Sequence, residues 1–316
     1  MPPRSPLPQR HGLDAAWIRT PSVGRDEPPP WETIGDFLMS RLPARANVAR
    51  MLVAGDFVDA HGRALDGTEP FTPHTFVWFH RPLAPEVPVP FPLTVLERDD
   101  YVVVVDKPHF MATTPRGAHV QESALVKARV MLGLPELAPA HRLDRLTAGV
   151  LVFTTRREYR AAYAGVFQSG LAHKEYEAIA AYNAGLEFPL RVANRIEKRP
   201  DSLQAEVVDG APNAETLIEV VEVRGRYACY RLTPRTGKTH QLRVHMAGLG
   251  IPIVGDSLYP QARVVEADDF SDPLHLVARR LSFVDPLTHV QRAYTSTVRL
   301  DWPSSTIGDA STGDLT

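Results

Sequence analysis

Prolines limit where this chain can form helices and strands. A proline has a fixed φ angle and no amide hydrogen, so closely spaced prolines prevent both helices and central strands. Met1–Pro30 contains eight prolines and shows no apolar periodicity, and Pro70–Pro92 contains seven. Regular structure is therefore expected between and after these two stretches. The predicted order is a disordered arm over residues 1–30, a small module over 31–81, a linker over 82–92, a large domain over 93–302 and a disordered tail over 303–316.

The composition excludes several classes of protein. No apolar run approaches the roughly 18 residues that a membrane-spanning helix needs. Cys229 is the single cysteine among the 316 residues, which excludes a disulfide framework and a zinc site built from cysteines. The first residues lack the apolar segment of a secretory signal. We expect a cytoplasmic protein that does not enter a membrane.

The order of predicted elements in the large domain indicates an α+β fold. Most of its strands follow residue 175 with little helix between them, which favours a mixed, largely antiparallel sheet with flanking helices. The predicted strands are Leu93–Glu97, Tyr101–Asp106, Val150–Thr154, Glu175–Ala180, Gln204–Val208, Glu215–Val223, Tyr227–Thr233 and Leu276–Phe283. The predicted helices are Ser123–Leu132, Glu158–Gln168 and His240–Leu249.

The small N-terminal module combines two helices with short strands. Apolar residues recur at helical spacing from Ile34 to Leu42, and a second helix is predicted over Ala46–Ala54. Phe57-Val58 and Thr75–His80 have the apolar character of short strands. This α/β outline fits an RNA-binding module, but many small domains share it.

Motifs for common cofactors fail on their spacing. Gly237-Lys238-Thr239 is similar to the end of a phosphate-binding P-loop, but Leu232 stands where the first glycine is needed. Gly248-Leu249-Gly250 lacks the third glycine of a dinucleotide-binding turn. His240 and His245 are five residues apart, whereas a helical metal-binding pair is spaced by four. We therefore predict neither a cofactor nor a metal.

A single carboxylate lies between two arginines in His141–Gly149. Asp144 is flanked by Arg142 and Arg145 in a segment that leads into the apolar strand Val150–Thr154. One interpretation is an ion pair on the surface. The other is a catalytic carboxylate, because guanidinium groups stabilise the anion that a nucleophile or a base requires.

Positive charge is concentrated in Arg224–Gly255. This segment contains six basic residues and no acidic one, in a chain whose formal net charge is −2. A solvated basic surface is one explanation. The alternative is a surface that binds the phosphates of a nucleic acid.

Several motifs in a fixed order resemble the RluA family of pseudouridine synthases. His141–Gly149 is similar to the family signature His-Arg-Leu-Asp-x-x-Thr-Ser-Gly, and Thr236–His245 to Thr-Gly-Arg-Thr-His-Gln-Ile-Arg-Val-His. Further motifs match at Asp106-Lys107-Pro108, Lys174-Glu175-Tyr176, Gly255-Asp256-x-x-Tyr259 and Leu274–Thr288. Ala148 and Lys238 depart from the family's usual serine and arginine. The resemblance covers residues 93–302 and implies the pseudouridine synthase fold with a central cleft, while residues 31–81 resemble a degenerate S4-like RNA-binding domain.

The resemblance implies isomerisation of uridine to pseudouridine in RNA, without a cofactor. Asp144 is the implied catalytic carboxylate. Tyr176 would stack on a uracil that has left the RNA helix, and Arg243 would pair with Asp144. Arg142 would occupy the space that the uracil vacates. The remaining implied RNA contacts are Arg145, Arg235, Lys238, His240, Gln241 and Leu242.

The target and the alternatives follow from the same resemblance. An S4-like module ahead of this catalytic domain favours large-subunit (23S) ribosomal RNA, and transfer RNA is the second candidate. A non-catalytic RNA-binding factor would use the same groove. A glycosidase would need a second carboxylate that these motifs lack. We expect the protein to be a monomer.

Overall fold

The chain divides into two units within the predicted linker over residues 82–92. The computed structural model describes residues 3–24 and 28–303, and its units are Met1–Glu86 and Val87–Thr316. The predicted tail over 303–316 lies outside the described residues, apart from Pro303. Within the described ranges, the helices are too short or too polar to span a bilayer.

The first unit is a two-stranded sheet with short helices. Strand β1 (Ala16–Arg19) pairs antiparallel with β2 (Phe76–Phe79). Helix α1 (Ile34–Arg41) begins at a capping box between Thr33 and Asp36, and α2 (Val48–Val53) follows a 3₁₀ turn (Ala44–Ala46). The prediction of a disordered arm over residues 1–30 is therefore wrong at β1, where prolines flank the four strand residues without interrupting them.

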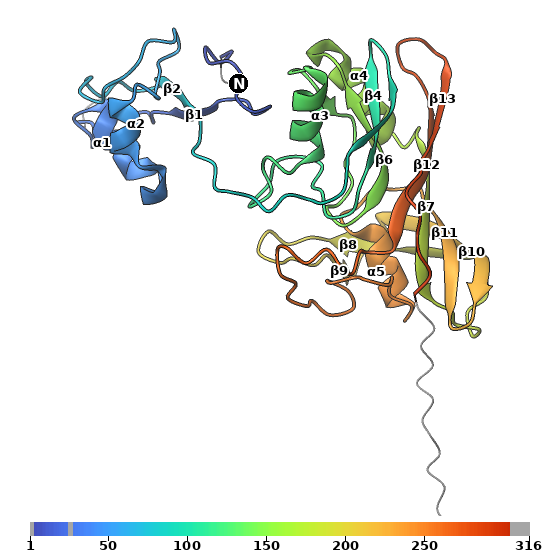
Figure 1. Cartoon of the computed structure of the whole chain (residues 1–316). Helices are drawn as coiled ribbons and strands as arrows, with labels where there is room; N and C mark the ends of the chain where they lie inside the picture. The colour runs from blue at the N-terminus through green and yellow to red at the C-terminus, as the bar shows by residue number, and fades with distance from the viewer. Residues whose placement is uncertain (1–2, 25–27, 304–316) are drawn as a thin grey trace, which may run out of the picture. The chain divides into compact units, whose positions relative to one another are not determined.

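The second unit is built on one mixed sheet (Figure 1). Its strand order among the described residues is β3-β4-β6-β12-β7-β11-β10-β8-β9, with β13 beside β12 and β5 beside β6. All neighbouring pairs are antiparallel except β6 with β12. The strands are β3 (Thr94–Arg98), β4 (Val102–Lys107), β5 (Ala138–Pro139), β6 (Ala148–Thr154), β7 (His173–Ala181), β8 (Leu190–Glu197), β9 (Glu206–Val208), β10 (Ala214–Arg224), β11 (Tyr227–Pro234), β12 (Leu276–Val284) and β13 (Gln291–Thr295).

Helices cover both faces of the central strands. They are α3 (Ala124–Leu132), α4 (Arg160–Gln168), which follows a 3₁₀ turn (Arg157–Tyr159), and α5 (Gln241–Gly248). Because side chains alternate along a strand, Val103 and Val105 join the core that contains residues of α3 and α5. Val102 and Val104 join the core on the other face, with residues of α4. All six residues of β4 are buried.

A glycine fixes the start of β6 next to the Asp144 loop. Gly149 has φ +116°, and a Cβ atom there would lie 2.3 Å from the carbonyl oxygen of Ala278. Only glycine allows β6 and β12 to approach so closely with this backbone conformation. The approach places the end of the His141–Gly149 loop against β12.

The predicted elements of the large domain agree with the structure to within about three residues at their ends. The sequence analysis did not predict β8, which has eight residues, or β13, which has five. Only one residue of β8 is fully buried, so its sequence lacks a continuous apolar face. The predicted strand at Phe57-Val58 is reduced to isolated bridges at Val58.

Candidate active site

The predicted catalytic residues lie around one pocket of about 740 Å³ in the second unit. Asp144, Tyr176 and Arg243 all line it. The walls come from the loop before β6, from β7 and from the loop between β11 and α5. The other predicted RNA contacts in the lining are Arg142, Arg235, Lys238, His240, Gln241 and Leu242.

Asp144 is accessible from this pocket. Its side chain is 27% exposed, and its nearest ionisable partner among the described residues is Nε2 of His240, at 4.0 Å from Oδ2. Burial lowers the pKa of His240, and the Asp144 carboxylate opposes that shift. No arginine nitrogen lies within 4.0 Å of the Asp144 carboxylate among the described residues. The interpretation of Asp144 as half of a surface ion pair is therefore not supported.

Tyr176 lies on β7 between β11 and β12. Its backbone is opposite Leu232 on one side and Ala278 on the other. Burial raises the pKa of its phenol above the usual value, and the Asp144 charge adds to this shift. The hydroxyl has no hydrogen-bond partner in the described part of the chain, so it remains a protonated group free to contact a ligand.

Gln241 holds the loop between β11 and α5 in place. Its Oε1 accepts hydrogen bonds from Thr236 Oγ1 (2.7 Å) and from the Lys238 amide (3.0 Å). Its Nε2 donates to Glu215 O and to Thr216 Oγ1, both at 2.9 Å. The predicted RNA contact of Gln241 is therefore replaced by a positioning role, because its buried amide is used internally.

The predicted ion pair between Arg243 and Asp144 is not found, and Arg243 pairs with Asp256 instead. Its Nε and a terminal nitrogen donate to the two Asp256 oxygens at 2.8 and 2.6 Å. The side chains are 2% and 1% exposed. Asp256 also accepts from the amides of Leu258 and Tyr259. A bidentate, fully buried pair of this kind fixes the guanidinium group in the pocket wall.

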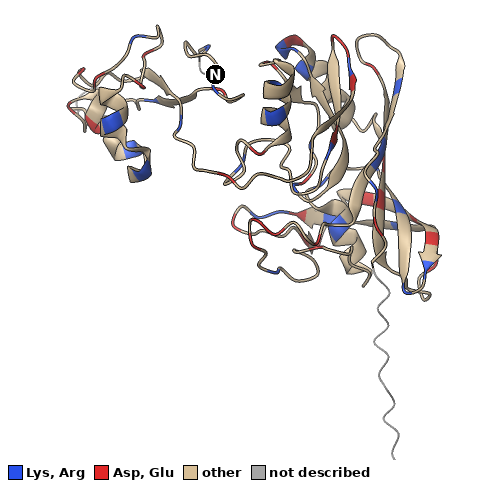
Figure 2. Cartoon of the chain, viewed as in Figure 1, with Lys and Arg blue, Asp and Glu red and all other residues tan. Residues whose placement is uncertain are grey.

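The basic stretch Arg224–Gly255 does not form a continuous cationic surface. Carboxylates from outside the segment pair with its arginines. Arg224 contacts Glu222 on the same strand, and Arg231 and Arg235 contact acids of the neighbouring strands β7 and β10. Figure 2 shows acidic and basic residues close together on these strands. The pocket itself retains positive charge. Arg142, Lys174 and Lys238 line it, and none has a carboxylate within 4.0 Å in the described ranges.

Arg145 is not among the residues that line the pocket, and its RNA contact stays a prediction. Its carbonyl accepts a hydrogen bond from Nζ of Lys107 at 3.3 Å. Nζ also donates to the carbonyls of Pro108 (2.9 Å) and Met111 (2.7 Å), and Lys107 is completely buried. Burial lowers the pKa of Lys107 to about 7, and the charge of Asp144 opposes this shift. Lys107 thus ties the end of β4 to the residue after Asp144.

Replacing Lys107 with methionine is expected to destabilise the protein by about 1–3 kcal/mol, because three buried carbonyls lose their donor. Urea unfolding of the purified variant measures the change. Lys127→Met is the matched control, since Lys127 forms a partly exposed ion pair with Glu122, and its loss should cost less than about 1 kcal/mol. Equal stability of the two variants would contradict the anchoring role of Lys107.

Sequence reasoning missed other pocket residues. Lys174 precedes Tyr176 by two positions, and this spacing on a strand places both side chains on the same face. The Lys-x-Tyr pattern was therefore the available signal. His141 stacks on Phe167 with ring centroids 4.3 Å apart, and burial lowers its pKa to about 3. Its Nε2 accepts the Val152 amide, which fixes the ring at the base of the loop.

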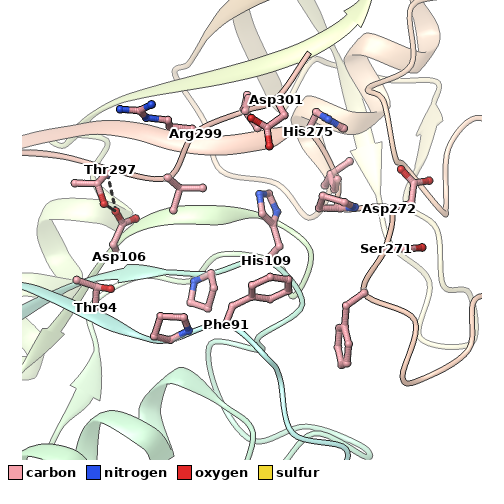
Figure 3. Close-up of a pocket in the computed structure, with 17 residues that line it drawn as sticks. Phe91, Thr94, Asp106, His109, Ser271, Asp272, His275, Thr297, Arg299 and Asp301 are labelled. Carbon is pink, nitrogen blue, oxygen red and sulfur yellow. Dashed lines mark hydrogen bonds between the residues drawn. The ribbon is translucent and has the colours of Figure 1, made fainter. Parts of the chain in front are cut away.

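A second cavity of about 610 Å³ lies elsewhere in the same unit (Figure 3). His109 is at its centre, and Nδ1 of this ring contacts the carbonyl of Leu146 at 2.7 Å. Asp106, at one side, accepts hydrogen bonds from Ser296 and Thr297. None of the predicted catalytic residues lines this cavity. Among the described residues, no group of three His, Cys, Asp or Glu side chains is arranged to hold a metal ion.

Comparisons of the sequence identify related proteins. Residues 101–248 match the family model of RNA pseudouridylate synthase. The dual-specificity RNA pseudouridine synthase RluA of Vibrio cholerae is 33% identical over 201 residues, covering 62% of this chain and 79% of the relative. Ribosomal large subunit pseudouridine synthase D of Xylella fastidiosa is 34% identical and covers 55% and 53% of the two chains. tRNA pseudouridine synthase C of Pasteurella multocida is 32% identical and covers 66% and 93%.

A solved structure shows the same fold. The human protein described as RNA pseudouridylate synthase domain containing 4 superposes with a TM-score of 0.51 at 26% identity, over 65% of this chain and 88% of its own. The matched region begins at residue 101, so it does not test the S4-like assignment of the first unit. The sequence matches and the shared fold show that this chain belongs to the RluA family of RNA pseudouridine synthases, enzymes that isomerise uridine to pseudouridine.

Proposed function

We propose that this enzyme modifies uridines of large-subunit (23S) ribosomal RNA, with Asp144 as its catalytic carboxylate. The observation that carries the proposal is the shared pocket, in which Asp144, Tyr176 and three cations without carboxylate partners face one space. A volume of about 740 Å³ is within the range of sites for small organic groups. It can hold one nucleoside that has left its helix.

The pocket offers a separate contact to each part of an everted uridine. The Tyr176 ring supplies an aromatic surface for the uracil, and Leu242 supplies an apolar wall. Arg142, Lys174 and Lys238 can bind the flanking phosphates. Arg142, which is exposed, can also fill the space in the RNA helix, because its planar guanidinium group stacks like a base.

The reaction breaks the bond between N1 and C1′ and forms a bond between C5 and C1′. The C5 proton leaves the ring and N1 gains one, so the product has the mass of the substrate and no electron is transferred. Asp144 can attack C1′, add to the base or remove a ribose proton. Each of these roles requires its carboxylate beside the reacting nucleoside. Arg243 would contribute a fixed positive charge near that carboxylate.

Two classes of RNA fit this site. Large-subunit ribosomal RNA is the first candidate because a relative bears the name ribosomal large subunit pseudouridine synthase D. Transfer RNA is the second candidate because another relative is named tRNA pseudouridine synthase C.

Chemical mapping of pseudouridine in cellular RNA tests the proposal. Carbodiimide mapping is carried out on cells that have the gene and on cells from which it has been deleted. The deleted cells are also mapped after they receive either the wild-type gene or the Asp144→Asn variant. Loss of signal at specific uridines of 23S RNA, restored only by the wild type, is the expected result. Loss confined to transfer RNA would establish the second candidate, and an unchanged map of all RNA would refute both.

A further inference from the structure

We propose that the outer face of the β1–β2 sheet in the first unit binds unpaired bases of the RNA substrate. This inference rests on the proposed function, since it assumes that the chain acts on RNA. The face consists of Trp17 and Arg19 on β1 and Phe76 and Trp78 on β2. We call these four side chains the aromatic face.

Strand register places these four side chains together. Trp17 is directly opposite Trp78, and Arg19 is directly opposite Phe76. Opposed residues in an antiparallel pair share one face of the sheet. The alternate positions, including Ile18 and Val77, face inward and join the core of the unit. The aromatic face is thus the side of the sheet that the unit's main core does not cover.

The aromatic rings on this face contact one another, and Trp17 is the one that is exposed. The ring centroids of Trp17 and Phe76 are 5.4 Å apart, and those of Phe76 and Trp78 are 6.5 Å apart with nearly parallel planes. Trp78 is only 3% exposed, because it packs in a small cluster with Leu7, Ala15 and Val58, so it anchors one side of the face without being accessible itself. Trp17, in contrast, is 44% exposed. An indole exposed to this extent offers a flat apolar ring on which a base can stack.

A cation accompanies the exposed ring. The Arg19 guanidinium carbon lies 5.6 Å from the centroid of the Phe76 ring, and a terminal nitrogen donates to Nδ1 of His74 at 3.0 Å. Arg19 has no carboxylate within 4.0 Å in the residues that the structure describes, and it is exposed. A guanidinium without a carboxylate partner, next to aromatic rings, complements a base and its phosphate, and this combination is typical of surfaces that bind single-stranded nucleic acid.

The aromatic face differs from the surface that an S4-like module would use. The two helices carry Arg41 and Arg50, with Arg45 between them. Arg41 packs over the ring of Trp31, with 5.3 Å between guanidinium carbon and ring centroid. Trp31 in turn contacts the core residues Phe37 and Phe71, so the pair of Arg41 with Trp31 packs against the core of the unit. The two surfaces can be separated by mutation.

The test is binding of a short, labelled oligouridine by the full chain, with zero-length ultraviolet cross-linking to locate the contact. A blunt duplex of the same length is the comparison probe. We expect a cross-linked peptide from residues 16–19 or 76–79. Trp17→Ala should weaken binding of the oligouridine about 10-fold, Trp17→Phe should retain most of the affinity, and binding of the duplex should change for neither variant.

Two further variants complete the test. Arg19→Ala should lower the slope of log affinity against log salt by about one unit. Met39→Ala is the control for truncation of an exposed apolar side chain, since Met39 is 54% exposed on α1, and it should bind as the wild type does.

Three outcomes would overturn the inference. Cross-links confined to residues 87–303, with wild-type affinity of Trp17→Ala, would show that the aromatic face does not touch RNA. Loss of affinity on replacing Arg41, Arg45 or Arg50 with alanine, but not Trp17, would assign binding to the helices. A change of oligomeric state in Trp17→Ala without a change in RNA binding would identify a protein interface. The result of the pseudouridine mapping does not depend on whether the aromatic face binds RNA. The proposed function and the proposed role of the aromatic face can therefore fail separately.

Discussion

Replacing Asp144 with asparagine is expected to lower pseudouridine formation by at least about 1,000-fold while RNA binding remains near that of the wild type. The amide has nearly the same shape as the carboxylate, so the loop should keep its conformation. What is lost is the anion. An amide can neither attack C1′ or the base nor accept a proton from ribose with useful affinity.

The surroundings of Asp144 make this substitution specific for chemistry. The carboxylate has no arginine partner within 4.0 Å in the described chain, and its closest ionisable neighbour is His240, at 4.0 Å, whose pKa is lowered by burial. Its replacement therefore breaks no direct ion pair with an arginine or a lysine in the described chain, and the buried Lys107, whose ammonium group the Asp144 charge also stabilises, keeps its three carbonyl acceptors. We expect unfolding by urea to be changed by less than about 0.5 kcal/mol.

Single-turnover conversion of a mapped RNA substrate measures the rate, and filter binding of the same RNA measures affinity. Asp209→Asn is the control, because Asp209 is an exposed carboxylate outside the pocket. It should convert the substrate at the wild-type rate. A turnover rate of Asp144→Asn within 10-fold of wild type, at unchanged affinity, would remove Asp144 from the reaction.

Local sequence pattern predicted most of the sheet but not all of it. Strands such as β4 and β6 are continuous apolar runs because helices cover both of their faces. β8 has no such signal, since only Ile196 is fully buried and the rest of the strand is partly solvated. β1 was missed because four residues between prolines are too few to show a period. It is fixed by pairing with β2, nearly 60 residues later in the chain.

Local sequence pattern also identifies only part of the candidate site. The motifs identified Asp144 and Tyr176, and the fold brings both to one pocket. The partner of Arg243 could not be found this way, because an ion pair depends on which loop returns to the helix. Lys107 was missed for a different reason, since lysine is almost never fully buried and nothing in its motif indicates the three carbonyls around it. The charge of Arg224–Gly255 was misleading because the acids that pair with its arginines lie outside this segment, on β7 and β10.

The ion pair between Arg243 and Asp256 has the second large expected effect. Asp256→Leu leaves the buried guanidinium of Arg243 without a counter-ion. Arg243→Met leaves the buried carboxylate of Asp256 without one. Each is expected to destabilise the protein by about 3–5 kcal/mol. Replacing both removes the two charges together, so the double variant should be clearly more stable than the sum of the single changes predicts. Urea unfolding of the four proteins gives the coupling energy.

The exposed pair Arg195–Glu197 is the matched control, with side chains that are 39% and 51% exposed and an N–O distance of 2.8 Å. Its coupling should stay below about 1 kcal/mol. A similarly small coupling between Arg243 and Asp256 would contradict the buried pair.

Activity of the double variant separates folding from chemistry. If Arg243 serves only to hold Asp256 and the loop after it, restored stability should restore turnover. We expect a different result, because Arg243 lines the pocket beside Asp144 and supplies a fixed positive charge there. The double variant should therefore remain at least about 10-fold slower than wild type in single-turnover assays, although its stability has recovered. Wild-type turnover by a stable double variant would reduce Arg243 to a structural residue.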